Sequence, residues 1–548
     1  MTWRHYFLLA VLGLIVVTVV AAFQSTPGYM DADYYYAGGL QLANGHGFTE
    51  PYLWNYLDNP TGLPHPSNAY WMPLASLLAA AGSALFGPAS WLAARIGFLV
   101  VAAIVPPLTA ALAWSFTSRR DLALVSGLLG VFSAFYLPFL PVTDTFGLYM
   151  VLGGLFFLLL SRTSSLFARI SLPLISILLG VIAGLMHFTR ADGLLWLLLA
   201  FMAIFLDRGD SVFSPKRFKV YAWRTALILT GYLLIMGPWF VRNYFAFGAP
   251  LGPGGVKMLW LTAYDQLFAY PPSQLTFAAW WQSGIASIMK ARAWALGINL
   301  ERTLAEQGEI FLLPLIGLGL WHLRHNLAVK MAGMAWLLTL AAMTLAFPYA
   351  GARGGFFHSC AALQPVWWAL APVGLDRVIA WGKRRRGWDA AQAGMVFRPA
   401  LVGLALLLSA GLVWGKVIGM DSTKASQTVF SPGAGVPQPG YLWSQENTAY
   451  RQIDSYLIEL GASHDDVIMV ANPPGFYLAS GNSTLAVPDG DIHTLMEVAR
   501  LYGATYLILE KGSMPVRLFA IYDHLEAQPE LVYKGEVAGA RIFLVDDH

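Results

Sequence analysis

Long apolar runs alternate with polar stretches along roughly the first three quarters of the chain. Runs such as Tyr6–Phe23, Met331–Phe347 and Pro399–Gly415 have the length needed to cross a hydrocarbon core about 30 Å thick. The 548 residues are 57% hydrophobic and 12% charged, whereas a soluble domain carries about 25% charged residues. The pattern therefore predicts a polytopic α-helical membrane protein.

The order of apolar runs and basic clusters predicts about eleven crossings. The expected transmembrane helices are Tyr6–Phe23, Trp91–Phe116, Leu122–Phe139, Phe146–Leu160, Leu172–His187, Gly193–Leu206, Ala222–Phe240, Ile310–Leu323, Ala328–Phe347, Ala361–Leu375 and Pro399–Val417. Trp71–Phe86 is also apolar, but Met72-Pro73 interrupts its start, and we expect it to lie at the membrane interface. With the N-terminus in the cytoplasm, this count places every basic cluster on the cytoplasmic side, as the positive-inside rule requires.

The polar stretches divide the chain into a membrane domain, a linker and a tail. The predicted parts are residues 1–420 for the membrane domain, 24–90 and 241–309 for its two long outer loops, 421–445 for the linker and 446–548 for the tail. In the tail, helical spacing over Glu446–Leu460 is followed by a short apolar strand pattern over Val467–Ala471. Such alternation predicts a small α/β domain, and the topology places it outside the cytoplasm.

Three aspartates are predicted to meet on the outer side. Asp31 and Asp33 stand beside tyrosines directly after the first apolar run, and Asp144 returns to the same side two crossings later. Carboxylates that share a site raise the pKa of at least one of them, which suits a general base. The same oxygens could instead hold Mg²⁺ or Mn²⁺, and the alternative without chemistry is that each aspartate caps a helix.

Basic side chains at the outer boundary indicate an anionic ligand. Arg190, Arg353 and His358 lie beside or within apolar helices, and His65 lies in the first outer loop. An arginine near hydrocarbon needs an anionic partner, and its fork matches phosphate oxygens. A lipid-linked phosphate is therefore the predicted ligand, and the alternative is snorkelling to headgroups or pairing with a local acid such as Asp192. The net charge of +3 does not indicate a nucleic-acid partner.

The order of these motifs resembles the GT-C glycosyltransferases, in the group that contains protein O-mannosyltransferases and the lipid A aminoarabinose transferase. The resemblance covers roughly residues 1–417. It is carried by the segments Asp31-Ala-Asp33-Tyr-Tyr, Gly45-His-Gly47-Phe, Pro64-His-Pro-Ser-Asn-Ala-Tyr-Trp-Met-Pro73, Thr143-Asp144 and Gly184-Leu-Met-His-Phe-Thr189-Arg190-Ala-Asp-Gly193. Asp31 matches the family's base and Asp144 its second-loop acid, while His65 is nearest to a basic residue that contacts donor phosphate. Members usually show Asp-Glu at the first motif, so the second acid here, Asp33, is displaced by one residue.

The resemblance implies an integral-membrane enzyme of the cell envelope. It would move a hexosyl or pentosyl group from a polyprenyl-phosphate sugar to a protein, lipid or polysaccharide acceptor, at the extracytoplasmic face of the plasma membrane. Asp31 would be the base, and cationic side chains would stabilise the leaving phosphate. A lipid-linked glycan flippase and a non-catalytic membrane scaffold are the rival hypotheses, and replacement of Asp31 by Asn separates them from an enzyme.

Overall fold

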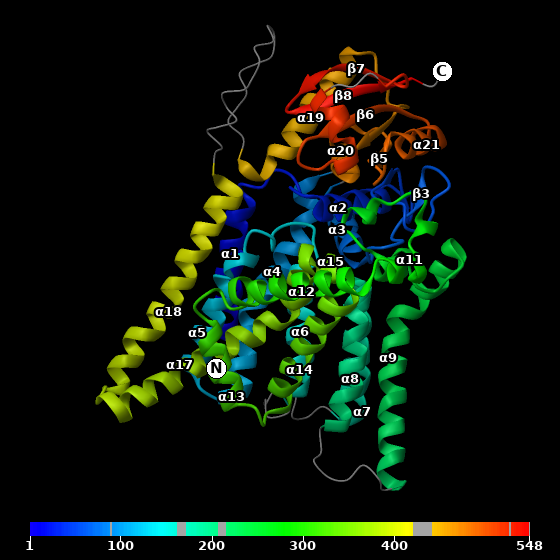
Figure 1. Ribbon diagram of the computed structural model, residues 1–548. Helices are drawn as coiled ribbons and strands as arrows, with labels where there is room; N and C mark the ends of the chain where they lie inside the picture. Colours follow the sequence, from blue (N-terminus) through cyan, green and yellow to red (C-terminus); the bar gives the residue numbers. More distant parts are fainter. Residues whose placement is uncertain (88–89, 162–170, 207–214, 420–440, 525–527, 547–548) are drawn as a thin grey trace.

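A bundle of helices carries a β-sheet at one end (Figure 1). The computed structural model describes residues 1–87, 90–161, 171–206, 215–419, 441–524 and 528–546. Six helical segments in these ranges are long and apolar enough to cross a membrane. They include α1 (Trp3–Ala21), α4 (Trp91–Thr117), α7 (Leu172–Thr189), α9 (Pro215–Phe247), α14 (Leu327–Ala341) and α18 (Ala390–Val413), and the segments that start with α14 and α18 extend to Ala346 and Ile418. Four shorter apolar helices are α3 (Leu74–Phe86), α6 (Phe146–Leu160), α8 (Leu194–Leu206) and α13 (Leu313–His322). Eleven crossings remain a prediction, and the predicted basic loops around 162–170 and 207–214 and most of the predicted linker lie outside the described residues.

Glycines allow the helices of the bundle to approach closely. A Cβ on Gly180 of α7 would lie 2.0 Å from the carbonyl oxygen of Ile228 on α9, and a Cβ on Gly319 of α13 would lie 2.3 Å from that of Leu370. Small residues at such crossings bring backbones into contact, which is how helices associate in lipid. Large apolar side chains such as Phe7 and Leu407 are exposed instead, as expected for lipid-facing positions.

Several predicted segments have other bounds in the structure. The outer loop expected over 241–309 contains α12 (Ile285–Arg302), which runs across the bundle in Figure 1. α17 (Gln364–Arg386) continues past the predicted end at Leu375, because its last turn holds a basic run that complements the helix dipole, and Gly387 at φ +70° ends it. Conversely, α5 (Arg120–Val131) stops well before Phe139.

The sheet at the end of the bundle has six strands in the order β2-β5-β4-β6-β8-β7. Five of them come from the C-terminal unit, by which we mean residues 441–524 and 528–546. They are β4 (Val467–Val470), β5 (Thr484–Ala486), β6 (Ala504–Glu510), β7 (Leu531–Val537) and β8 (Ala540–Val545). The sixth, β2 (Tyr52–Leu53), belongs to the segment predicted as the first outer loop and pairs in parallel with β5. The tail predicted as a separate domain therefore shares its sheet with the membrane domain.

Alternating side chains give the sheet two apolar faces. Ile468 and Ile508 pack on one side with α19 (Gln445–Glu459), while Met469 and Leu507 pack on the other with α21 (Ile492–Tyr502). In strands that are buried on both sides, successive residues point to opposite faces. The sheet, which is packed on both faces, lies over α2 (Met30–Ala43) and α3 (Figure 1).

Candidate active site

The first catalytic candidate, Asp31, is the second residue of α2. Tyr29, rather than an aspartate, is the N-cap residue of this helix, so the helix-cap alternative is not what the structure shows for Asp31. The turn before it depends on Gly28, whose φ is +94° and whose Cβ, if present, would lie 2.2 Å from the indole nitrogen of Trp443. Asp31 keeps 31% of its side chain exposed.

Asp144 lies beside α2 in the loop that precedes α6, and its side chain is 1% exposed. The Tyr29 hydroxyl donates a hydrogen bond to its Oδ2 at 2.5 Å, and the Thr145 backbone N–H and hydroxyl donate to its Oδ1 at 2.5 and 3.1 Å. The Thr143 hydroxyl donates to the carbonyl of Ala32, at 2.7 Å, and so ties this loop to α2. The structure therefore brings Asp31 and Asp144 together, as the sequence predicted.

His358 stands between these two acids. It belongs to α16 (Phe356–Cys360) and stacks on the Phe146 ring with centroids 4.0 Å apart. Its Nε2 is 3.6 Å from Asp31 Oδ2 and its Nδ1 is 3.7 Å from Asp144 Oδ1. We call Asp31, Asp144 and His358 the acid–imidazole cluster. The sequence had grouped His358 with the phosphate-binding candidates, and Asp33 with the acids.

Arg190 borders the cluster from the end of α7. Its Nε–H donates to Asp192 Oδ1 at 2.9 Å, and Asp192 Oδ2 accepts a 2.5 Å hydrogen bond from the Ser359 hydroxyl. Its guanidinium also lies over the Tyr149 ring, 5.9 Å from the centroid. Arg190 therefore pairs with Asp192, which was the alternative to phosphate binding that the sequence left open. This pair orients the guanidinium and leaves it beside the acid–imidazole cluster.

The environments of the two acids differ. Burial, then the charge of Asp144, raises the pKa of Asp31 to about 7, against the opposing effect of Arg190. Burial also raises the pKa of Asp144, but its hydrogen bonds from Tyr29 and Thr145 favour the charged form. Burial and the charges of Arg190 and Arg302 lower the pKa of His358, which favours the neutral imidazole. The pKa of Asp31 is thus raised toward neutrality, and hydrogen bonds oppose such a rise for Asp144.

The remaining predicted residues lie in three different surroundings. Arg353 places its guanidinium 4.4 Å from the centroid of the Tyr264 ring, and Tyr264 is close enough to Asp31 for their charges to interact. His65 lies in β3 (His65–Pro66), where its Nε2 is 2.6 Å from Asp58 Oδ2. Asp33 is buried against the C-terminal unit.

The structure adds residues that the sequence reasoning did not select. The Tyr29 hydroxyl donates to Asp144, and the Ser359 hydroxyl donates to Asp192. In the sequence, only their positions next to the motifs at Asp31 and His358 could have pointed to them. The cluster also offers a ligand set to a divalent metal, because one ligand atom from each member lies within 4.8 Å of the others. Carboxylate and imidazole ligands suit Mn²⁺, and Mg²⁺ less well because of the nitrogen.

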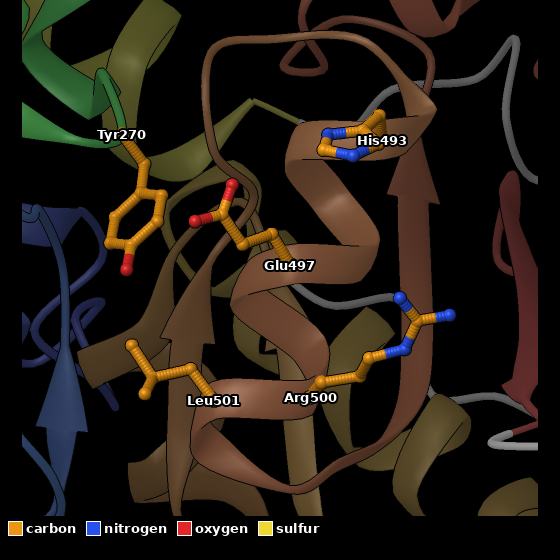
Figure 2. A pocket seen from close by; sticks show the side chains of 5 residues that line it. All are labelled: Tyr270, His493, Glu497, Arg500 and Leu501. Carbon is orange, nitrogen blue, oxygen red and sulfur yellow. The ribbon is translucent and has the colours of Figure 1, made fainter.

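A hollow of about 400 Å³ lies between the C-terminal unit and Tyr270 (Figure 2). Tyr270, in the segment predicted as the second long outer loop, faces Glu497 of α21 across the hollow. His493, Arg500 and Leu501 lie on the same helix as Glu497. None of the predicted site residues lines the hollow.

Comparison with solved structures identifies the fold. ArnT from Cupriavidus metallidurans bound to undecaprenyl phosphate matches with a TM-score of 0.57 and 11% identity, over 98% of this chain and 97% of that one. The oligosaccharyltransferase of Archaeoglobus fulgidus, in complex with Zn and sulfate, matches with a TM-score of 0.51 and 10% identity, over 91% and 67%. No protein-family model and no curated protein matches the sequence. The chain therefore has the GT-C-like membrane fold, as the motifs predicted.

Proposed function

We propose that this protein is a membrane glycosyltransferase that uses a polyprenyl-phosphate sugar as donor. The observation that carries the proposal is the division between two neighbouring carboxyls. Asp31 is 31% exposed and its pKa is raised to about 7, whereas Asp144 is buried and accepts hydrogen bonds from three donors. Acids with such different environments take different roles in catalysis. The GT-C-like fold supports the same assignment, since ArnT was captured with undecaprenyl phosphate.

In the proposed reaction, Asp31 Oδ2 accepts the proton of an acceptor hydroxyl or amine. The acceptor atom then forms a bond to the anomeric carbon as the bond from that carbon to the phosphate oxygen breaks. The electron pair leaves with the polyprenyl phosphate, and the configuration at the anomeric carbon inverts. Positive charge beside the departing oxygens stabilises this step, and Arg190 and Arg353 are the proposed sources.

The acid–imidazole cluster could alternatively hold Mn²⁺ or Mg²⁺. An ion there would supply positive charge to the donor phosphate, and it would occupy the Asp31 oxygen that otherwise accepts the proton. The two roles of Asp31 exclude each other in one step, so chelation distinguishes them. His65, buried beside Asp58, keeps its predicted phosphate role only as a hypothesis, and the outward orientation of the site is likewise part of the proposal.

The test uses the full-length protein in lipid nanodiscs with a panel of radiolabelled polyprenyl-phosphate sugars and membrane extract as acceptor. Wild type should transfer or release label, and Asp31→Asn should lower the rate by about 100- to 10,000-fold, because that is the typical contribution of a general base. Asp465→Asn, the same change on an exposed carboxyl, is the matched control and should retain the wild-type rate. Wild-type protein that moves the lipid-linked sugar across the bilayer without consuming it would overturn the proposal in favour of a flippase.

A further inference from the structure

Asp33 faces away from the proposed reaction. It follows Asp31 by two residues in α2, and residues two apart on a helix do not share a face. The residue is 7% exposed, and its Oδ2 accepts a hydrogen bond from Asn472 Nδ2 of the C-terminal unit at 2.9 Å. The same Nδ2 donates to Glu446 Oε1, also at 2.9 Å. We call these three residues the α2 joint.

The α2 joint is tightly packed, and Asn472 also binds the start of another helix. Asn472 Oδ1 accepts the backbone N–H of Gly475 at 3.1 Å and so caps α20 (Pro473–Ser480). A Cβ on Gly475 would lie 2.5 Å from Asn472 Nδ2 and 2.9 Å from Asp33 Oδ2. Only glycine therefore lets α20 come this close to α2.

Further contacts hold the same segment on both sides of Asp33. Before it, the Trp443 indole N–H lies 3.1 Å from the carbonyl oxygens of Thr26 and Pro27. After it, Gln41 Nε2 donates to the Tyr477 hydroxyl at 2.7 Å. The C-terminal unit thus contacts the catalytic helix before its start, in its first turn and near its end.

We propose that Asp33 is a positioning residue, through which the C-terminal unit holds α2 so that Asp31 stays in register with Asp144 and His358. The inference rests on the proposed transfer reaction for its kinetic consequence. The contact between α2 and the C-terminal unit itself is independent of that reaction. Asp33 acts here as a hydrogen-bond acceptor, so its charge is not what the joint requires.

The first test replaces Asp33 in two ways. Asp33→Leu removes the acceptor and should lower kcat about 10- to 100-fold with little change in KM for the donor, because a displacement of about 1 Å at the reacting groups costs up to 100-fold. Asp33→Asn keeps an acceptor oxygen for Asn472 and should rescue kcat to within about threefold of wild type. An Asp33→Asn protein as inactive as Asp31→Asn would overturn the proposal, because Asp33 would then be needed as a charge in the reaction.

The second test exchanges the hydrogen-bond donor and acceptors of the α2 joint. Asn472→Asp keeps the cap of α20 but removes the donor between the two carboxylates, and should lose activity as Asp33→Leu does. The triple variant Asp33→Asn/Asn472→Asp/Glu446→Gln supplies donors on both flanks of the new carboxylate, and should recover at least about tenfold over Asn472→Asp. Full activity in both Asp33→Leu and Asn472→Asp would show that the joint positions nothing.

Hydrogen exchange separates this proposal from the proposed reaction. The amides of the first turns of α2 should exchange at least about tenfold faster in Asp33→Leu than in wild type or Asp33→Asn. Unchanged exchange would overturn the positioning role whether or not transfer is found. Absence of transfer in wild type, with the expected exchange pattern, would remove the glycosyltransferase assignment and leave the joint in place.

Discussion

Removal of the Asp144 charge should shift the pH dependence of the enzyme to lower pH. The pKa of Asp31 is raised to about 7, and the negative charge of Asp144 is one of its causes. Asp144→Asn keeps the size of the side chain and an oxygen for the Thr145 donors, so the loop should fold as before. The change removes the charge that opposes ionisation of Asp31.

The size of the shift follows from the geometry. The ligand oxygens of the two acids lie within 4.8 Å of each other. At that separation, two unit charges interact by about 0.9 kcal/mol in water and about 3.5 kcal/mol at an effective dielectric constant of 20. One pKa unit corresponds to 1.36 kcal/mol, so the pKa of Asp31 should fall by about 0.6 to 2.5 units.

The assay is kcat/KM for the donor between about pH 5 and pH 9, which reports ionisations of the free enzyme. A base must be unprotonated to work, so wild-type activity should rise with pH and level off above about pH 7. The rising limb should move to lower pH in Asp144→Asn, whatever the maximal rate of the variant. A limb that stays in place or moves to higher pH would refute the assignment of Asp31 as the base beside an ionised Asp144. Tryptophan fluorescence over the same range is the control for unfolding.

Three other changes test the site and its support. Arg190→Lys keeps the charge but loses the planar fork that Asp192 orients, and should lower kcat/KM for the donor about 10- to 100-fold; a value equal to wild type would remove Arg190 from phosphate binding. EDTA should leave transfer intact and millimolar Mn²⁺ should inhibit it, because a metal in the acid–imidazole cluster would occupy the base; loss of activity in EDTA with recovery in Mn²⁺ would favour the metal role instead. Gly475→Ala should lower the free energy of unfolding by about 1–3 kcal/mol, because the new methyl group would overpack against Asn472 and Asp33. Thermal unfolding measures this loss against the control Gly481→Asn, which places a residue that tolerates positive φ at an open position. Equal stability of the two variants would show that α20 can move away from α2.

The sequence was most informative where a single physical rule dominates. Apolar length marked α1, α4 and α7 within a few residues, because a helix in lipid must satisfy its own backbone. The motif order also predicted the GT-C-like fold. Asp31 and Asp144 were found as a pair because the two crossings predicted between them return the chain to the side from which it started.

Long-range contacts were beyond that reasoning. β2 is only two residues long and pairs with a strand more than 400 positions later, so no local pattern marks it as part of the sheet. For the same reason, the predicted group of acids contained Asp33, whereas the acid–imidazole cluster contains His358. The face on which Asp33 lies depends on the turn at Gly28, and the position of His358 depends on the packing of α16 against Phe146. α12 was missed because its polar and apolar residues are mixed, as in a helix that lies along a surface.

The arrangement of the acid–imidazole cluster explains why two carboxylates are more useful here than one. Asp144 accepts hydrogen bonds from Tyr29 and Thr145, which favour its charged form against the effect of burial, and its charge is one of the causes that raise the pKa of Asp31. Asp31 is on a helix whose position depends on the membrane domain on one side and on the C-terminal unit on the other. A base tuned by a fixed neighbour is sensitive to the distance between them, because Coulomb energy changes steeply at short range. In the proposed reaction, we expect the α2 joint and the Thr143–Ala32 contact to serve the same end, which is to keep that distance constant while substrates enter and leave.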